Sequence, residues 1–269
     1  MPELPDLQVI QKVLNQKIQG LQIEEVQILQ PIVIRYPSLE QFAQSLGGKA
    51  ILQVSRRGKF LIFHLETDFQ LVLHLMLAGR LQLCEPAVRL KSRTCLRLGL
   101  SNAAELRYFD PKLMGRVYLV EGNDFSVIPQ FLSLGPEPLD DEFTLNVFQK
   151  RIRRHPGEIK NLLTNQSFLA GIGNAYADEI LFAAGIFPFR RRPSLSPEEI
   201  ERLYHSTKKV LSEAIQTISG RVGEQIDIEL RDFLRVHRRG GQYCPVCGHK
   251  ISEIKANRKI TSFCRNCQR

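Results

Sequence analysis

Three features are scarce in this chain of 269 residues: long apolar runs, internal repeats and, toward its end, acidic side chains. No run approaches the roughly 18 consecutive apolar residues that a membrane helix needs. Glu3, Asp6 and Lys12 stand where a secretory leader would carry a basic start and an apolar stretch. With 43% hydrophobic residues available for cores, the sequence predicts a folded cytoplasmic protein without a membrane partner.

The scarcity of acids in Arg235–Arg269 makes this segment strongly basic. It holds nine Lys or Arg residues and the single acid Glu253, so it carries +8 of the chain's net charge of +9. A basic tail on a nearly neutral body predicts a polyanionic partner, of which nucleic acid is the commonest. The alternative is a basic surface that serves solubility alone.

Four of the six cysteines form two C-x2-C pairs separated by sixteen residues: Cys244, Cys247, Cys264 and Cys267. Two thiolate pairs on tight turns can meet one tetrahedral zinc ion, and the intervening residues suffice for a β-hairpin. Because sulfur fills all four ligand positions, we expect one structural zinc. A disulfide framework is the alternative, and an intracellular location disfavours it. Cys84 and Cys95 are interpreted as packing residues.

Hydrophobic periodicity divides the chain into three parts. Apolar residues at helical spacing predict a helix from Pro5 to Gly20, and short alternating runs predict a β-sandwich or barrel from residue 23 to about residue 120. The Pro- and acid-rich segment 135–143 precedes a helical region. We therefore expect an α+β protein with a β domain over 1–130, a helical module over 131–234 and a zinc hairpin over 235–269.

Several motifs occur in one order along nearly the whole chain: "PELP" at residue 2, "SRRGKFLIFHL", "LRYFDPKLMG", "AGIGNAYADEILF" and the terminal cysteine pairs. In this order they resemble the family of formamidopyrimidine-DNA glycosylase and endonuclease VIII. The resemblance implies an N-terminal helix with a catalytic β-sandwich, a helix-two-turn-helix DNA-binding module and a zinc finger. It also implies a monomeric base-excision-repair enzyme that acts on damaged double-stranded DNA.

The resemblance gives the first residues a chemical role. Removal of Met1 would leave Pro2 as a secondary amine, and a free α-amine has an ordinary pKa of about 7.7–8.0, so part of it is unprotonated at neutral pH. Attack on a sugar C1′ gives an iminium, which releases the base and then permits β- and δ-elimination. Glu3 would be the general acid at the ring oxygen. The alternative is an ordinary cleavable start followed by a helix-entry acid.

Three further catalytic positions follow from the same matching. Asp6 stands where the family usually has Glu, and it either assists the amine through water or is only a first-turn helix acid. Lys59 matches a phosphate-contacting lysine at a hairpin tip, with a solvated turn lysine as the alternative. Glu179 matches a carboxylate that faces the active site.

The DNA-contacting positions implied by the resemblance are His74, Arg93, His155, Lys160 and Asn174. Gly171 and Gly173 break the backbone before a helix that Asn174 can cap, which favours an anion site. Leu77 and Met114 fall on positions whose side chains wedge into DNA when a nucleotide is flipped out. Lys112 stands where the family has an arginine, so it lacks the planar guanidinium that could recognise the base opposite the lesion.

Two departures bear on the substrate. The family's zinc-finger arginine position holds Lys259, with Arg258 before it, so either cation could serve δ-elimination and phosphate grip. The segment between the last long helix and the zinc hairpin lacks a Gly-Gly-Thr lesion-capping loop. We expect a bifunctional glycosylase and abasic-site lyase acting on ring-opened or 8-oxo purines. Oxidised-pyrimidine or mainly abasic-site specificity is one alternative, and a DNA-binding module without catalysis is another.

Overall fold

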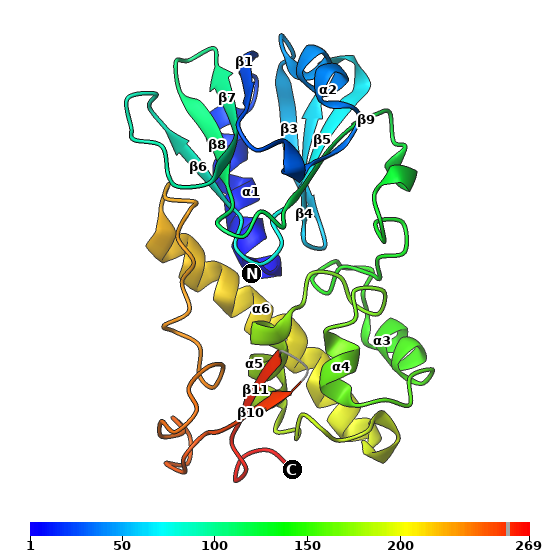
Figure 1. Ribbon diagram of the computed structural model, residues 1–269. Helices are drawn as coiled ribbons and strands as arrows, with labels where there is room; N and C mark the ends of the chain where they lie inside the picture. Colours follow the sequence, from blue (N-terminus) through cyan, green and yellow to red (C-terminus); the bar gives the residue numbers. More distant parts are fainter. Residues whose placement is uncertain (257–258) are drawn as a thin grey trace. The chain divides into compact units, whose positions relative to one another are not determined.

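The computed structural model describes residues 1–256 and 259–269 (Figure 1). It divides into two compact units. Unit 1 comprises Met1–Ser133 and Thr217–Glu229, and unit 2 comprises Leu134–Gln216 and Leu230–Arg269. The segment that follows the longest helix thus packs with the N-terminal part of the chain before the chain enters unit 2 again.

Unit 1 contains two helices and nine strands among its described residues. The helices are α1 (Leu4–Ile18) and α2 (Leu39–Leu46), and the strands are β1 (Ile23–Ile28), β2 (Ile34–Tyr36), β3 (Ile51–Arg57), β4 (Phe60–Leu65), β5 (Phe69–His74), β6 (Arg80–Cys84), β7 (Thr94–Leu100), β8 (Glu105–Phe109) and β9 (Arg116–Glu121). They form a four-stranded sheet in the order β1-β7-β8-β6 and a five-stranded sheet in the order β2-β9-β5-β4-β3. The predicted β-sandwich with an N-terminal helix is confirmed (Figure 1).

Helix α1 is anchored on both its apolar and its polar side. Leu7, Leu14 and Ile18 are at most 1% exposed, as the helical spacing of apolar residues requires. The Asn15 amide donates to the Val54 carbonyl at 2.7 Å and accepts from the Val54 N–H at 2.7 Å. Because β3 is an edge strand of the five-stranded sheet, this amide satisfies backbone groups that would otherwise lack a ladder partner. Helix α1 is therefore held against the sheet, most directly through its C-terminal half.

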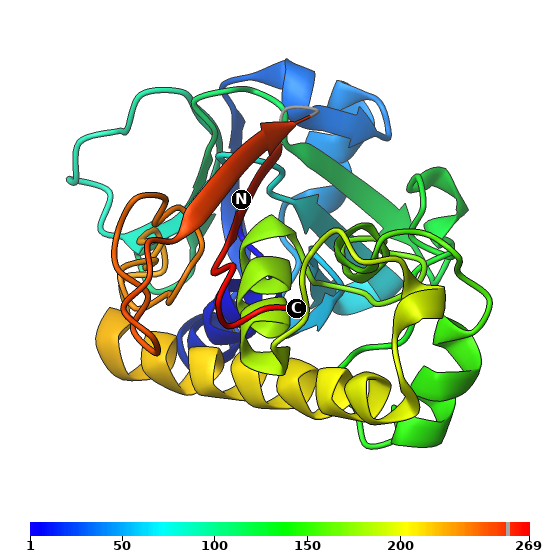
Figure 2. The same ribbon diagram turned by 90° about the horizontal axis from the view of Figure 1, so that it is seen from below.

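Unit 2 contains helices and a two-stranded hairpin. Its elements are α3 (Leu145–Ile152), α4 (Ile159–Leu163), α5 (Asn174–Ala184), the larger part of α6 (Pro197–Val222), β10 (Ser252–Ala256) and β11 (Lys259–Phe263). Helix α5 is buried along nearly its whole length, and the hairpin lies beside it in both views (Figures 1 and 2). Within the described residues, no helix is both long and apolar enough to span a bilayer.

Candidate active site

The beginning of the chain is fixed in the first turn of α1. Pro2 is buried, Glu3 is 3% exposed and Asp6 is 7% exposed. Asp6 Oδ2 accepts the Glu3 backbone N–H at 2.8 Å as part of a capping box. Of the two interpretations of Asp6, the structure shows this first-turn contact. The contact fixes the backbone beside Pro2, the expected nucleophile.

Lys59 and His74 lie at the same end of two neighbouring strands, β4 and β5, of the five-stranded sheet. Lys59 occupies the β3–β4 turn and is only 7% exposed, so it is not a solvated turn lysine. Strand register pairs the adjacent Phe60 with His74, and the two rings meet edge to face at 4.6 Å. Burial, together with the charges of Lys59 and Arg116, lowers the pKa of His74 from 6.5 to about 4. His74 is therefore neutral at physiological pH.

The hydrogen bonding of His74 fixes its tautomer. The Met76 backbone N–H donates to His74 Nδ1 at 3.2 Å, so the ring proton resides on Nε2. A neutral imidazole in this state presents one N–H donor and no charge. Such a donor suits a phosphate oxygen without the cost of burying an imidazolium.

The two expected wedge residues are exposed at loop tips. Leu77 is 43% exposed and Met114 is 40% exposed, which is unusual for large apolar side chains. The residues before them, Met76 and Leu113, have φ angles of 51° and 53°. These values lie in the left-handed backbone region that residues other than glycine rarely adopt. Strained backbone of this kind is found where a loop must aim a side chain.

One buried tyrosine packs against both of these loops. A Cβ added at Gly115 would lie 1.5 Å from the Tyr108 hydroxyl, and one added at Gly79 would lie 2.9 Å from the same atom. Only glycine therefore fits at position 79, two residues after Leu77, and at position 115, directly after Met114. Burial raises the pKa of Tyr108 far above its ordinary value, so the hydroxyl stays protonated.

Asp110 organises the second loop from inside. It is fully buried and accepts the backbone N–H groups of Lys112, Met114 and Gly115 at 2.8–2.9 Å. Its own N–H donates to the Arg93 carbonyl at 3.0 Å, and Arg93 is itself exposed with a φ of 59°. The exposed Lys112 and Met114 thus project from a loop whose backbone is fixed by a buried carboxylate.

In unit 2, Lys160 is buried and fully engaged. It is 5% exposed, and its Nζ lies 2.6 Å from Asp178 Oδ1, 2.9 Å from the Ile260 carbonyl and 2.7 Å from Thr261 Oγ1. These contacts join α4, α5 and β11. The structure therefore shows Lys160 as a link between the helices and the hairpin.

Asn174 does not cap α5 as the sequence suggested. Gly173 occupies the N-cap position, and Asn174 is the first helical residue. The Asn174 amide donates to the Ile260 carbonyl at 2.6 Å, the same oxygen that Lys160 contacts. Because Gly173 occupies the N-cap, the Asn174 side chain is not used for capping. It instead binds the hairpin through the Ile260 carbonyl.

Glu179 is placed among backbone donors. It is 4% exposed and accepts the N–H groups of Arg235, Val236 and His237, each at 2.8 Å. Burial raises its pKa, and the three N–H donors oppose that rise. In the structure it anchors the segment that leads into the cysteine-rich hairpin.

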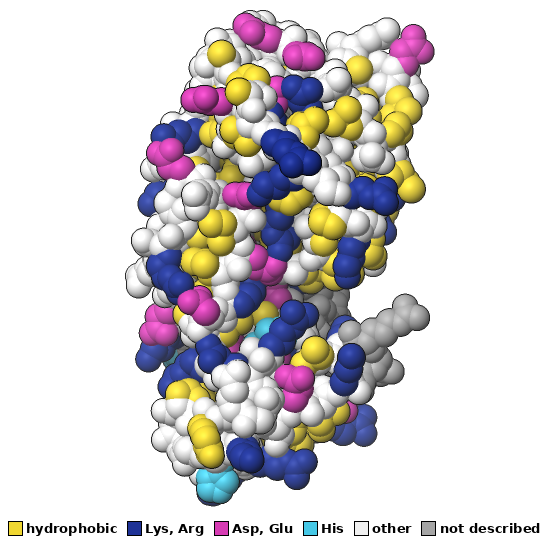
Figure 3. All heavy atoms as spheres, turned by 60° about the vertical axis from the view of Figure 1, so that its left-hand side comes forward, with side chains coloured by type: hydrophobic (Ala, Val, Ile, Leu, Met, Phe, Trp, Pro, Cys, Tyr) yellow, Lys and Arg dark blue, Asp and Glu magenta, His cyan; other side chains and the backbone are white. Residues whose placement is uncertain are grey.

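His155 lies at a basic pocket of about 220 Å³ whose other lining residues are Lys150, Arg151 and Arg154. Its ring packs edge to face on Phe168 at 5.2 Å. Lys and Arg side chains are spread across the face drawn in Figure 3, with acidic side chains among them. Cationic groups that could meet a polyanion are therefore not confined to the basic C-terminal segment.

The four cysteines of the two pairs come together in unit 2. Their sulfur atoms all lie within 4.8 Å of one another, with Cys244 and Cys267 at 3.8 Å and Cys247 and Cys264 at 3.4 Å. Sulfurs bound at about 2.3 Å to one tetrahedral ion lie about 3.8 Å apart, whereas a disulfide is about 2.05 Å long. The cluster has the dimensions of a metal site.

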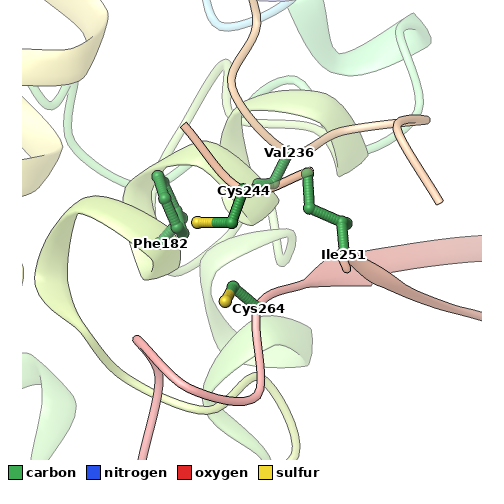
Figure 4. Close-up of a cluster of buried hydrophobic side chains, with 5 residues drawn as sticks. All are labelled: Phe182, Val236, Cys244, Ile251 and Cys264. Atoms are coloured by element: carbon green, nitrogen blue, oxygen red, sulfur yellow. The ribbon is translucent and has the colours of Figure 1, made fainter. Parts of the chain in front are cut away.

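The cysteine cluster is also part of a small core. Cys244 and Cys264 are buried with Phe182, Val236 and Ile251 (Figure 4). Phe182 belongs to α5, so the cluster ties the hairpin to the helical module. Lys259, exposed at the start of β11, is carried by this hairpin. Arg258 lies outside the described residues.

Sequence reasoning missed the residues that position the others. Tyr108 and Asp110 set the wedge loops, and Asp178 pairs with Lys160. Tyr108 and Asp110 lie within the "LRYFDPKLMG" motif, and Asp178 directly precedes Glu179. Gly79, two residues after Leu77, and Gly115, directly after Met114, were the available signal. A glycine near an exposed apolar residue indicates a close approach of the backbone.

Comparisons with known proteins agree with this architecture. One family model, "Formamidopyrimidine-DNA glycosylase N-terminal domain", matches residues 1–117, and a second, "Formamidopyrimidine-DNA glycosylase H2TH domain", matches residues 134–225. The two matches, in this order, define a DNA glycosylase built from a β-sandwich domain and a helix-two-turn-helix module.

Individual relatives match over the full length. A formamidopyrimidine-DNA glycosylase of Pelotomaculum thermopropionicum is 38% identical over 100% of this chain and 99% of its own. The structure of Lactococcus lactis Fpg in complex with DNA containing an abasic site has a TM-score of 0.90 at 30% identity and covers 99% of both chains. A structure of MutM with DNA containing carbocyclic 8-oxo-G has a TM-score of 0.90 at 31% identity and covers 100% of both chains. This chain belongs to the formamidopyrimidine-DNA glycosylase family.

Proposed function

We propose that this protein is a bifunctional DNA glycosylase and abasic-site lyase of base excision repair. It acts as a monomer inside the cell on damaged double-stranded DNA and removes ring-opened or 8-oxo purines. Family membership supports the glycosylase activity, and the DNA complexes of the solved relatives support the kind of ligand. The lyase activity and the residue roles rest on the geometry of the chain start.

The observation that carries the proposal is the fixed, buried position of Pro2 and Glu3. A terminal amine on a frayed chain would lose entropy on ordering, but here Pro2 leads directly into a buried helix whose first turn is capped by Asp6. Glu3 is 3% exposed beside it. A nucleophile and a carboxyl group are thereby held in one place before substrate binds.

The chemistry follows from these two groups. The Pro2 nitrogen, freed by removal of Met1, forms a bond to C1′, and the base departs with the electron pair of its glycosidic bond. Glu3 donates a proton to the ring oxygen as the sugar opens. The resulting iminium acidifies the C2′ proton, and successive β- and δ-eliminations cleave the strand.

The remaining unit 1 residues are assigned to DNA binding. Lys59 and the neutral Nε2–H of His74 contact phosphates beside the lesion, and exposed Arg93 contacts the backbone. Leu77 and Met114 fill the space that a flipped nucleotide leaves. Lys112 faces the orphaned base as a single point charge, which predicts weak discrimination among opposite bases.

In unit 2 we assign a role to one zinc ion. The donor set of four thiolates and the separations of the sulfur atoms fit this metal. Because no ligand position is left for water, the zinc would hold the hairpin in place and perform no chemistry. Lys259, carried by this hairpin, or Arg258 would grip the phosphate in δ-elimination. His155 would contact the DNA backbone, and Lys160, Asn174 and Glu179 would support DNA binding through the segment 235–269 that they hold in place.

We further propose that the chain has three functional domains. Residues 1–130 form the catalytic domain, residues 131–234 the helix-two-turn-helix module and residues 235–269 the zinc finger. The buried links from Lys160, Asn174 and Glu179 to the last segment support the view that the zinc finger works as an extension of the helical module.

Borohydride trapping on duplexes containing an abasic site tests the proposal. Processed protein, with Met1 removed, should form a covalent adduct with the DNA and nick the strand. Pro2→Gly should lose trapping and base excision, and Glu3→Gln should lower base excision about 10²- to 10⁴-fold. Glu24→Gln, an exposed carboxylate on β1, is the control and should leave the rate unchanged. A processed wild type that neither traps nor nicks would show the enzymatic assignment to be wrong.

A further inference from the structure

A second carboxylate lies at the N-terminal amine. Glu229 Oε1 is 3.3 Å from the Met1 nitrogen, and Glu229 Oε2 pairs with the Arg80 guanidinium. The side chains of Glu229 and Arg80 are 24% and 14% exposed, so this is a partly buried pair and not a loose surface contact. All three residues belong to unit 1. The contact joins positions 228 residues apart in the sequence.

Glu229 differs from the other acids of its segment. Three acids that follow α6 pair with bases of unit 1: Glu224 with Lys17, Asp227 with Lys91, and Glu229 with Arg80. The first two contacts connect the segment to α1 and to the loop between β6 and β7. Of these three acids, Glu229 also contacts the terminal amine, through the carboxylate oxygen that does not face Arg80. A purely structural tether does not require that second contact.

The chain start leaves a chemical task for such a carboxylate. A secondary amine that adds to C1′ becomes a positively charged nitrogen with one hydrogen, and this proton must leave before the lone pair can form an iminium. Asp6 already accepts the Glu3 N–H within the capping box. Glu3 is assigned as the acid of the ring oxygen, so it must be protonated at the moment when a base is needed.

Removal of Met1 takes away the nitrogen that contacts Glu229 and leaves the Pro2 nitrogen one residue further along the chain. One residue of backbone spans at most about 3.6 Å, so the Pro2 nitrogen lies within about 7 Å of the oxygen that contacts the Met1 nitrogen. One water molecule, or a change of rotamer in the partly exposed Glu229, closes this distance.

We propose that Glu229 is a further catalytic residue of the proposed reaction, the acceptor of the proton that the Pro2 nitrogen releases after it bonds to C1′. The inference rests on the proposed function. Arg80 is a positioning residue, because its guanidinium holds one carboxylate oxygen and so aims the other at the amine.

Atoms and electrons balance in this step. The nitrogen lone pair forms the N–C1′ bond while the base leaves with the electron pair of the C1′–base bond and takes a proton from water. The cationic nitrogen then gives its proton to Glu229 Oε1 and regains a lone pair. That lone pair forms the C1′=N double bond as the C1′–O4′ bond breaks, and O4′ takes its proton from Glu3.

Single-turnover kinetics on processed protein test this role. At saturating duplex, Glu229→Gln should lower the rate of borohydride trapping on an abasic-site duplex by about a hundredfold, as loss of a general base does. Affinity for a duplex with a tetrahydrofuran abasic analogue should change less than threefold. Glu229→Asp should restore part of the rate. Asp227→Asn, which breaks the neighbouring pair with Lys91, is the matched control and should trap at the wild-type rate.

The outcomes separate the two proposals. If the wild type traps and Glu229→Gln traps equally fast at saturation, Glu229 is not the acceptor and only this inference is overturned. The inference is also overturned if Glu229→Gln and Asp227→Asn are equally slow, because the segment would then act as a tether. If the wild type itself does not trap, the proposed function is wrong and the role of Glu229 is withdrawn with it. Unchanged thermal melting of Glu229→Gln shows that the variant is folded.

Discussion

Two sets of motif residues, one in each unit, are held in opposite ways. In unit 1, Arg93, Lys112 and the apolar Leu77 and Met114 are exposed on loops, and buried Tyr108 and Asp110 hold those loops from beneath. In unit 2, Lys160 and Glu179 are at most 5% exposed, and hydrogen bonds within the unit engage them.

This difference shows that residues which match family motifs equally well can have different roles. An exposed cation on a braced loop has its donors available for DNA, whereas a buried cation with three oxygen partners has already used them. We therefore expect substitutions of the exposed set in unit 1 to change binding and catalysis without unfolding the protein. Substitutions of the buried set in unit 2 should act mainly through stability.

Metal removal should have the largest effect, and it should affect unit 2 while leaving unit 1 folded. The cysteine cluster joins the hairpin to α5 through Phe182, so chelation should cost about 5 kcal/mol or more of local stability. Hydrogen exchange should rise over residues 235–269 and stay low in α1 and the sheets of unit 1. Tight duplex binding should be lost, and metal analysis should give one zinc per chain.

A matched pair of cysteine variants controls this experiment. Cys247→Ser should reproduce the effect of the chelator, while Cys84→Ser, outside the cluster, should leave metal content and affinity unchanged. Retained tight binding after complete zinc loss would contradict the structural role of the metal.

Two lysines test the comparison at single-residue scale. Lys160→Met leaves buried Asp178 without its cation, although His237 still contacts the same carboxylate. Breaking such a pair should cost about 3 kcal/mol in the free energy of unfolding. Lys112→Met, on an exposed loop, should change stability by less than about 0.5 kcal/mol. Because Lys112 is assigned to the orphaned base and not to a phosphate, its loss should weaken binding while leaving the salt slope of binding nearly unchanged.

Denaturant unfolding and salt titration of binding measure the two effects. Equal loss of stability in both variants would show that burial does not separate the two units. A Lys160→Met protein that is fully stable but binds DNA weakly would return Lys160 to the role that its motif implies.

Much of this fold was readable from the sequence, because periodicity reports burial directly. The apolar spacing of α1 predicted a helix from Pro5 to Gly20, close to the observed Leu4–Ile18, and the cysteine spacing predicted a hairpin. Polar residues carry no such signal. A buried Lys160 and an exposed Lys112 are the same letter, and only the tertiary partners Asp178, Ile260 and Thr261 distinguish them.

Contacts between distant segments were likewise out of reach of prediction from motifs. Glu229 is 228 residues from the amine that it contacts, in a segment without any recognisable pattern. In the sequence Tyr108 is an ordinary strand residue, and only the fold brings the loops of Gly79 and Gly115 against its side chain. In each case the function of a side chain depends on which backbone passes nearby, and that is a property of the fold.

His74 is the intermediate case, a half-buried donor in unit 1, and its titration gives the smallest predicted effect. Its native pKa of about 4 lies below the ordinary 6.5, so between these values the unfolded chain binds a proton that the native protein does not. Stability from this residue is therefore present above pH 6.5 and lost as the pH falls toward 4. The expected loss between pH 7 and pH 5 is about 2 kcal/mol. His74→Gln should flatten this dependence in denaturant melts, and His205→Gln, an exposed histidine, should keep it. An unchanged slope in His74→Gln would show that His74 titrates normally and belongs with the exposed set.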